Sequence, residues 1–464
     1  MSKRLFAVAA GLWVYGLVAV GQGAPQYAKP TGAVDAPTFT KDVAPILYKS
    51  CTNCHRPGEI APMSLLTFKD ARPWAKSIRD KVSQGLMPPW HADPTHGEFV
   101  NDRRLSDADK DTILKWVAGG APEGNPADLP PQPKYAEGWM MGHPDSVMAM
   151  TEEYPLPASG TVEYKYFEIP TNYTEDKYIQ AIEVVPGNRR VVHHVIVFAR
   201  APLPPAPPPD APPRPQPQPQ PAVFKFAPDM EQPKDPEREA KKKGPANDRP
   251  APQRMGSFVG GFAPGQNMRL YEPGQAIKVP AGSVLVFQMH YTPNGTATAD
   301  RTKVGFIFAK EPPKQEMKIT ALINANFTIP PGAPDQRVDA EMTIQRDITV
   351  WSMLPHTHVR GKRWEYQAIY PDGRTETILA VPKYDFNWQT EYIFKQPLKL
   401  PKGTKIHSTA WYDNSAANRS NPDPSSEVHW GDQTWEEMQF SGITYTVDPA
   451  PAAPTAEVKP GGGK

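Results

Sequence analysis

Residues 191–198 read VVHHVIVF, an apolar run rich in β-branched residues with two histidines near its centre. Residues 284–290 read VLVFQMH, and residues 351–358 read WSMLPHTH. Apolar runs of this length between turn residues are typical of buried β-strands. The three stretches therefore predict strands that carry histidines into or beside a packed β-core.

Runs of the same kind recur along the chain from residue 151 onward. The predicted strands are Tyr164–Ile169, Tyr178–Val185, Val191–Phe198, Ser283–Tyr291, Lys303–Phe308, Lys318–Thr328, Glu341–Trp351, Trp364–Tyr370, Ile406–Trp411 and Met438–Val447. Short strands separated by Pro, Gly, Asn and Asp favour antiparallel sandwiches or jelly rolls. The region is too long for one ordinary sandwich of about 100 residues. We predict two tandem all-β jelly-roll domains, over 151–313 and 314–447.

Residues 38–122 have a different, helical pattern. Val43, Ile46 and Leu47 follow helical spacing, and a second helical run covers 71–84. A third run begins after Ser106, a good N-cap, and stops at two glycines. The pattern predicts a small all-α domain, preceded by a linker over 24–37 and followed by one over 123–150.

The N-terminus has the pattern of a secretory signal peptide. Lys3 and Arg4 precede the uncharged run Leu5–Val20, and Gly21-Gln22-Gly23 follows it. This order predicts a signal over residues 1–23, cleaved before Ala24. An uncleaved anchor is the alternative, although the run is shorter than the roughly 20 residues of a membrane span. We expect a periplasmic or secreted protein with no membrane span after cleavage.

Composition excludes several functions. The 51 Lys and Arg residues balance 50 Asp and Glu residues, so no basic field exists to bind nucleic acid. Two cysteines exclude a disulfide framework. Twelve of the 58 prolines fall within residues 201–222, and apolar-poor sequence follows to residue 254. We predict that 201–254 is a disordered insertion that can be shortened without loss of fold, and that 448–464 is a disordered tail.

Residues 51–55 read CTNCH, the attachment signature of c-type haem. Each thiol, Cys51 and Cys54, forms a thioether to one haem vinyl group, and His55 then ligates the iron. A redox dithiol or half of a zinc site has similar spacing. Because the chain has no second cysteine pair and the setting is helical, we predict one covalent haem.

The sixth haem ligand is less constrained by the sequence. Met87 stands in a proline-braced loop, GLMPPW, and a thioether ligand raises the reduction potential as electron transfer requires. Met63, His91 and His96 are alternatives. The order of attachment motif, late Met loop and final helix resembles class I cytochromes c over residues 38–122.

The β-region histidines are placed unevenly. His356 and His358 are two residues apart, so both imidazoles face one side of a strand and suit one metal ion. His193 and His194 are adjacent and face opposite sides of a regular strand, so they share a metal only at a bulge or strand end. A single strand histidine such as His290 is commonly a hydrogen-bonded structural residue.

The order His-His, His-Tyr, His-Thr-His and a late Met resembles the copper type II ascorbate-dependent monooxygenases, which include peptidylglycine α-hydroxylating and dopamine β-monooxygenases. The resemblance covers residues 151–447 and implies two copper ions. By resemblance, His193, His194 and His290 ligate the copper that accepts electrons. His356, His358 and Met438 ligate the oxygen-activating copper and are the catalytic set.

Departures from that family limit the substrate. The peptide-hydroxylating enzyme holds a peptide carboxylate with Arg, Asn and Tyr, and this chain has Leu354, Phe440 and Gly442 at the matching positions. The sequence therefore predicts hydroxylation of another small organic molecule by O2, with electrons from a reductant such as ascorbate or a redox protein passing through the haem. The alternatives are a non-enzymatic electron-transfer or copper-binding protein, and a ligand-binding jelly roll with structural histidines.

Overall fold

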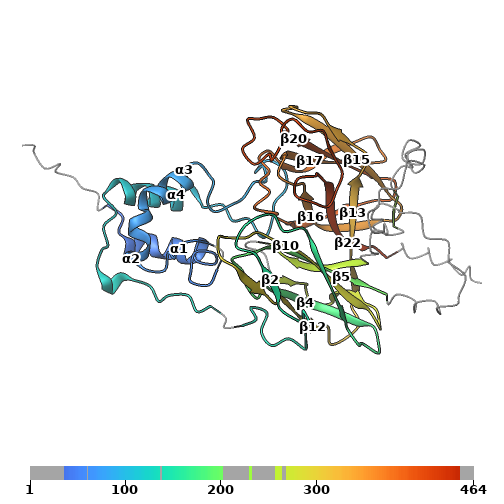
Figure 1. Ribbon diagram of the computed structural model, residues 1–464, viewed down its shortest axis with the longest axis horizontal. Coiled ribbons are helices and arrows are strands. Elements are labelled where there is room, and N and C mark those ends of the chain that lie inside the picture. The colour runs from blue at the N-terminus through green and yellow to red at the C-terminus, as the bar shows by residue number, and fades with distance from the viewer. Residues whose placement is uncertain are drawn as a thin grey trace, which may run out of the picture. The chain divides into compact units, whose positions relative to one another are not determined.

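The computed structural model describes residues 36–59, 61–135, 138–201, 229–231, 256–263 and 268–449. The signal peptide, most of the Pro-rich insertion and nearly all of the tail lie outside these residues. The described chain is mostly β-sheet, as expected, with its helices confined to the N-terminal part (Figure 1). None of the described helices combines the length and apolarity of a membrane span.

The helical segment has its own core. Its elements are η1 (Phe39–Val43), α1 (Ala44–Ser50), α2 (Phe68–Ala71), η2 (Arg72–Trp74), α3 (Ala75–Ser83) and α4 (Asp107–Ala118), and a short η3 (Pro126–Asp128) follows. Ser106 caps α4, its hydroxyl accepting from the Asp109 amide. Leu47, Ile113 and Trp116 are fully buried together. Residues 90–101 do not join this core, because Trp90 and Phe99 pack into the C-terminal β-core.

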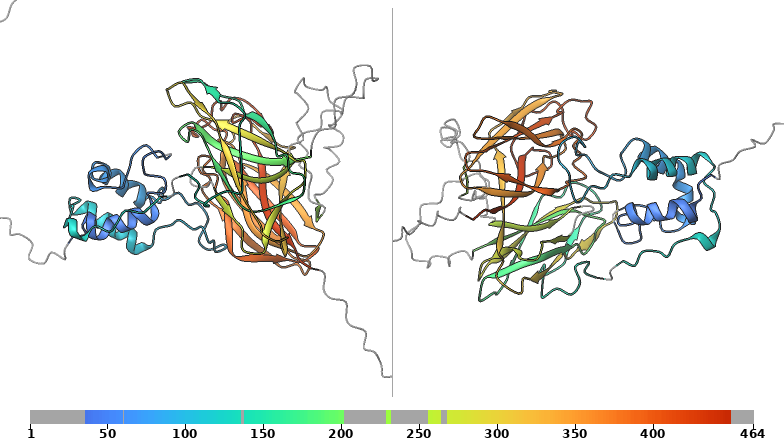
Figure 2. Two further views of the ribbon diagram at one scale, coloured as in Figure 1. Left: turned by 90° about the horizontal axis from the view of Figure 1, so that it is seen from below. Right: turned by 180° about the vertical axis from the view of Figure 1, so that it is seen from behind.

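The strands form two groups, coloured mainly green to yellow and orange to red in Figures 1 and 2. The first group is β1 (Ser146–Ala149), β2 (Tyr154–Leu156), β3 (Lys165–Pro170), β4 (Lys177–Val185), β5 (Val192–Arg200), β7 (Ser257–Phe262), β8 (Met268–Leu270), β9 (Gln275–Val279), β10 (Val284–Tyr291), β11 (Thr298–Asp300) and β12 (Lys303–Phe308). The second is β13 (Gln315–Asn324), β14 (Thr328–Ile329), β15 (Gln336–Ile344), β16 (Ile348–His356), β17 (Gly361–Ile369), β18 (Thr375–Val381), β19 (Tyr392–Leu400), β20 (Lys405–Tyr412), β21 (Val428–His429) and β22 (Gln439–Val447).

One long sheet runs through both groups. Its strand order is β1-β12-β4-β9-β13-β22-β16-β19, with β8 also on β4. A sheet β3-β10-β5-β7 belongs to the first group. A sheet β18-β17-β20-β15-β6, in which β6 is Met230–Glu231, belongs to the second. Each group has a separate apolar core. The boundary expected near residue 313 therefore falls within one continuous sheet, where β9 and β13 pair in parallel rather than antiparallel.

Two local predictions are wrong. The run Glu341–Trp351 is not one strand, since it crosses the turn at residues 345–347 between β15 and β16. Residues 146–149, assigned to a linker, form β1 on the edge beside β12. The first error arose because the turn Gln345-Arg346-Asp347 contains neither glycine nor proline to mark a break, and the second because an edge strand has only a weak alternating pattern.

The prediction of disorder over 201–254 is also wrong at one point. Met230 and Glu231 form β6, which pairs with Ile344 and Thr343 of β15. Asp229 and Met230 are buried. The Asp229 carboxylate accepts from Lys318 Nζ at 3.0 Å, Arg346 Nη1 at 3.3 Å and the Tyr445 hydroxyl at 3.2 Å. A buried carboxylate with three donors fixes this short segment to the second group of strands.

We expect Asp229→Ala to lower the free energy of unfolding by about 2 kcal/mol, because it leaves the Tyr445 hydroxyl and two cations without their acceptor. Asp229→Asn keeps the shape and one acceptor oxygen, so its loss is smaller. Chemical denaturation of both variants measures the difference. Equal stability of Asp229→Ala and the parent protein would contradict the anchoring role of this segment.

Candidate metal centre

The first histidine cluster is built by a β-bulge. In the pairing of β5 with β10, His194 lies opposite His290, but the next pair is Val192 with Tyr291. His193 is thus the extra residue of the bulge, and its side chain turns to the same side as His194. One ring nitrogen each from His193, His194 and His290 lies within 4.8 Å of the other two. The structure therefore brings these three predicted ligands together through a β-bulge, which the adjacent positions of His193 and His194 require.

The hydrogen bonds show which nitrogens face the centre of this cluster. The Tyr164 hydroxyl lies 3.2 Å from Nε2 of His194, and the Thr434 hydroxyl lies 3.2 Å from Nε2 of His290. The Nδ1 atoms of His193 and His194 are 3.2 Å apart. Nδ1 of His290 is buried and has no hydrogen-bond partner among the described residues. Such an unpartnered buried nitrogen, facing other lone pairs, fits a metal-binding role.

Burial keeps these imidazoles neutral. Desolvation lowers the pKa of His193 to about 4 and that of His290 to about 3. The pKa of His194 also falls well below its usual value because of burial, and the neighbouring histidines add to the effect. At neutral pH each ring therefore has a free lone pair, which is the form that binds a metal ion.

The His-Thr-His pair lies at the end of β16. The ring centroids of His356 and His358 are 5.3 Å apart, as expected for residues on one side of the chain. Gln389 Oε1 lies 2.9 Å from His356 Nδ1, and the Glu436 carbonyl lies 3.0 Å from His358 Nδ1. These contacts leave the Nε2 atoms for a ligand, and Nε2 of His358 is buried without a partner among the described residues.

Met438 lies next to this pair in the fold. Met438 directly precedes β22, whose residue Phe440 pairs with His356 at the end of β16. Its side chain is half-buried, and its carbonyl accepts from the Tyr412 hydroxyl at 2.8 Å. Ligation by its sulfur stays a prediction.

Sequence reasoning missed the residues that hold these histidines in place. Glu437 is fully buried, and its carboxylate accepts from the amides of His358 at 2.7 Å and Arg360 at 2.6 Å. Burial raises its pKa to about 8. Gln389, Thr434 and Tyr164 contact the imidazoles directly. A polar residue in a long loop gives no sequence pattern, so only the fold identifies these partners.

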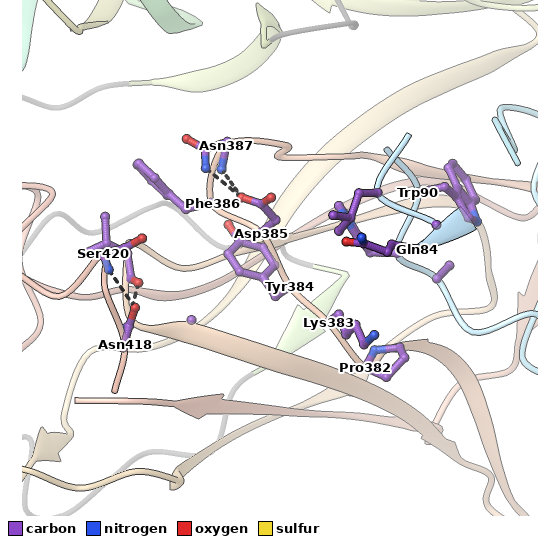
Figure 3. Close-up of a pocket in the computed structure, with 16 residues that line it drawn as sticks. Gln84, Trp90, Pro382, Lys383, Tyr384, Asp385, Phe386, Asn387, Asn418 and Ser420 are labelled. Atoms are coloured by element: carbon purple, nitrogen blue, oxygen red, sulfur yellow. Dashed lines mark hydrogen bonds between the residues drawn. The ribbon is translucent and has the colours of Figure 1, made fainter. Parts of the chain in front are cut away.

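A cavity of about 610 Å³ lies close to the histidine groups, and none of their five histidines is among the residues that line it. Residues 382–387 form one wall, and residues 84–86 and 90–92 form another (Figure 3). Phe386 lies in this wall, and its ring stacks on His193 with centroids 5.0 Å apart. The Tyr384 hydroxyl, in the same wall, donates to the carbonyl of Thr357 at 2.9 Å. The cavity therefore reaches the residues that hold both histidine groups.

The CTNCH segment forms a compact turn directly after α1. The amides of Cys54 and His55 both donate to the Cys51 carbonyl, at 3.1 and 2.9 Å. Burial raises the pKa of Cys51 to about 12, which disfavours the thiolate that a redox dithiol needs. Nδ1 of His55 is buried without a partner in the described chain.

The alternatives for the sixth haem ligand are placed differently. Met63 and Cys51 both pack against the helical core. Met87 is half-buried, and the loop that carries it continues to Trp90 in the C-terminal β-core. His91 lines the cavity described above. Ligation by Met87 stays a prediction, and Met63 is the rival that packs with the CTNCH turn.

We expect haem-linked peroxidase staining to persist on denaturing gels of protein matured in the periplasm, because thioether bonds survive unfolding. Cys51→Ala/Cys54→Ala removes both bonds and should abolish the stain. A stain that disappears from the parent protein on denaturation would rule out covalent attachment.

No protein-family profile and no curated protein matches the chain. Among solved structures, that of infectious bursal disease virus Gt strain aligns with 66% of this chain over 71% of its own chain, at 10% sequence identity and a TM-score of 0.18. A Paenibacillus xanthan lyase aligns over 71% of this chain and 28% of its own, at 10% identity and a TM-score of 0.16. The coconut allergen cocosin aligns over 64% and 86%, at 8% identity and a TM-score of 0.12. Structural similarities this weak give no information about the function of the chain.

Proposed function

We propose that this chain is a copper-dependent monooxygenase of the type II, ascorbate-dependent kind, built of two jelly-roll domains and fused to a c-type cytochrome domain. The observation that carries the proposal is the convergence of His193, His194 and His290 at a β-bulge, next to the His356–His358 pair. His193, His194 and His290 belong to the sheet β3-β10-β5-β7, and His356 ends β16 of the long sheet. The two histidine groups match the ligand order that the sequence predicts.

The donor set favours copper over zinc. Neutral imidazoles suit copper in both oxidation states, and a methionine thioether favours Cu(I). The half-buried Met438, the predicted third ligand of the His356–His358 group, would supply that soft donor. Structural zinc takes four Cys or His ligands, and neither group has four. Catalytic zinc takes three, so the preference for copper rests on the predicted Met438 ligand.

In the proposed reaction, one atom of O2 is inserted into a substrate C–H bond to give an alcohol, and the other leaves as water. Two electrons and two protons from the reductant balance the reaction. Bound copper supplies the oxygen chemistry and passes electrons singly.

The chain's own residues orient the imidazoles. Gln389 and the Glu436 carbonyl hold Nδ1 of His356 and His358, which fixes the rings with Nε2 toward the ligand. Tyr164 and Thr434 hold Nε2 of His194 and His290, which turns Nδ1 inward instead. The His356–His358 pair therefore presents Nε2 atoms to a bound metal ion, whereas His194 and His290 present Nδ1 atoms.

Electron delivery from the haem to the first histidine group is supported by an ion pair. Glu59, four residues after the attachment histidine, lies 3.3 Å from Arg189, four residues before His193. Arg56 also pairs with Glu59 at 2.8 Å and donates to the carbonyls of Thr52 and Asn53 within the CTNCH motif. These contacts join the proposed haem turn to the turn that leads into β5.

Elemental analysis and O2 uptake test the proposal on protein expressed with haem maturation. Two coppers per haem, with O2 uptake that depends on substrate and reductant, would support it. Two coppers without uptake across a panel of small organic substrates would favour a non-enzymatic electron-transfer protein. Absence of copper would leave the histidines structural. His407→Ala is the matched control, since His407 of β20 pairs with Asp339 of β15 and belongs to neither histidine group.

A further inference from the structure

The cavity of about 610 Å³ lies between two segments that the fold joins firmly (Figure 3). One wall comes from residues 84–92 and another from residues 382–387. Trp90 of the first wall packs into the C-terminal β-core, and the Asp93 amide, directly after this wall, donates to the Ala380 carbonyl at 2.9 Å. Small-molecule sites are usually preformed cavities of roughly 300–1,000 Å³. This cavity meets both conditions.

Aromatic side chains supply much of the apolar lining. Trp90 is only 6% exposed, and its ring packs edge-on against that of Tyr392, with centroids 5.1 Å apart. Tyr384 and Phe386 line the opposite wall and are half-buried. Aromatic rings in a wall favour a ligand that has a ring of its own, through edge-to-face or offset contacts.

One polar group of the lining lacks a partner. The Asp385 carboxylate accepts from the amide and the side chain of Asn387, both at 2.9 Å, and the Asn418 side chain accepts from the Ser420 amide at 3.0 Å. By contrast, Nε1 of Trp90 is buried without a hydrogen-bond partner in the described chain. A buried N–H without an acceptor is costly, so a ligand oxygen that accepts from it is favoured.

The charges of the lining favour a neutral ligand. Among the described residues that line the cavity, Lys383 and Asp385 carry opposite charges that cancel. Burial lowers the pKa of His91, so its imidazole is neutral at neutral pH. The cavity therefore has no net charge with which to attract an ion.

The cavity also adjoins the backbone of the His-Thr-His segment. Val359, which directly follows His358, is one of the lining residues. The Tyr384 hydroxyl donates to the Thr357 carbonyl at 2.9 Å and accepts from the Thr357 amide at 3.2 Å. A ligand in the cavity therefore lies beside the segment that carries the proposed catalytic pair.

We infer that this cavity binds a small neutral molecule that combines an aromatic ring with a hydrogen-bond-accepting oxygen, and that the indole N–H of Trp90 recognises the oxygen. Identifying this ligand as the substrate rests on the proposed function. Because residues 84–92 form one wall, the region that carries the proposed haem also takes part in ligand binding.

Calorimetric titration of the whole chain with acetophenone tests the inferred ligand class. Acetophenone is neutral and aromatic, and its carbonyl oxygen accepts but does not donate. We expect saturable binding that is about fivefold or more tighter than that of toluene, which lacks the oxygen. Cyclohexyl methyl ketone, which lacks the aromatic ring, and the ions benzoate and benzylammonium should also bind more weakly.

Trp90→Phe tests the role of the indole. This change keeps an aromatic ring but removes the N–H, so acetophenone should bind about fivefold more weakly while toluene binds as before. Trp364→Phe is the matched control. Nε1 of Trp364 is also buried without a partner in the described chain, but Trp364 does not line the cavity. Its variant should bind acetophenone as the parent does.

Several outcomes overturn the inference without touching the proposed function, because calorimetry requires no oxygen chemistry. Equal binding of acetophenone and toluene by the parent protein, or tighter binding of either ion, contradicts the ligand class. Equal losses in Trp90→Phe and Trp364→Phe contradict the role of Trp90. The ligand series is measured on the parent protein, so a variant that fails to fold does not remove the test.

The substrate role is tested separately on copper-loaded protein. Acetophenone-dependent O2 uptake, with a KM that rises in Trp90→Phe while kcat is unchanged, would support it. Acetophenone binding without uptake, in protein that consumes O2 with another small organic molecule, overturns the substrate role. Absence of uptake with every molecule counts against the proposed function instead.

Discussion

Replacing His356 with alanine is expected to lower substrate-dependent O2 consumption by more than about 100-fold, since even loss of a residue that supports a ligand costs about 10- to 100-fold. The imidazole lies at the end of β16 beside His358, and Gln389 Oε1 lies 2.9 Å from its Nδ1. Its removal leaves the His356–His358 pair with one imidazole. The absorption spectrum of the proposed haem should stay unchanged, because the CTNCH turn packs with the separate helical core.

Gln389→Ala provides a graded comparison. It leaves both imidazoles in place but removes the acceptor 2.9 Å from His356 Nδ1, so we expect a loss of about 10- to 100-fold. His407→Ala changes a histidine outside the site and should retain full activity. Full O2 consumption by His356→Ala would contradict the assignment of the catalytic group.

The sequence allowed prediction of the parts of this site that depend on local pattern. The β-region, the histidine strands and the requirement for a bulge at His193 all follow from residues close together in the chain. The bulge is present, and it lies opposite His290. His356 and His358 are brought together as the two-residue spacing predicts.

What the sequence did not predict depends on long-range pairing. The parallel contact of β9 with β13 merges two expected sheets into one, and nothing in either strand specifies that partner. Asp229 lies within apolar-poor sequence, yet its carboxylate meets donors 89 to 216 residues away. Thr434 and Gln389 are ordinary polar loop residues until the fold sets them beside the histidines.

Reversing the charge of Arg189 is expected to slow electron transfer from the haem to the first histidine group by about tenfold or more, because Arg189→Glu places like charges beside Glu59, which costs up to several kcal/mol. Glu59 and Arg189 are 16% and 19% exposed, so water screens the pair only in part. Arg189 is joined to His193 by at most about 14 Å of chain, so a displaced turn also separates the haem from the ligands. Stopped-flow reoxidation of the reduced haem measures this rate.

Arg190→Glu is the matched control, because it makes the same charge change on the same turn at an exposed residue that is not paired with Glu59. Its rate should stay near that of the parent. Glu59→Arg/Arg189→Glu restores opposite charges across the contact and should recover most of the lost rate, whereas either single reversal should not. The remaining loss of rate is expected because Arg56, which pairs with Glu59 in the parent protein, then faces an arginine at position 59. If Arg189→Glu and Arg190→Glu slow the haem equally, the effect comes from net charge, and the ion pair does not position the haem for electron transfer.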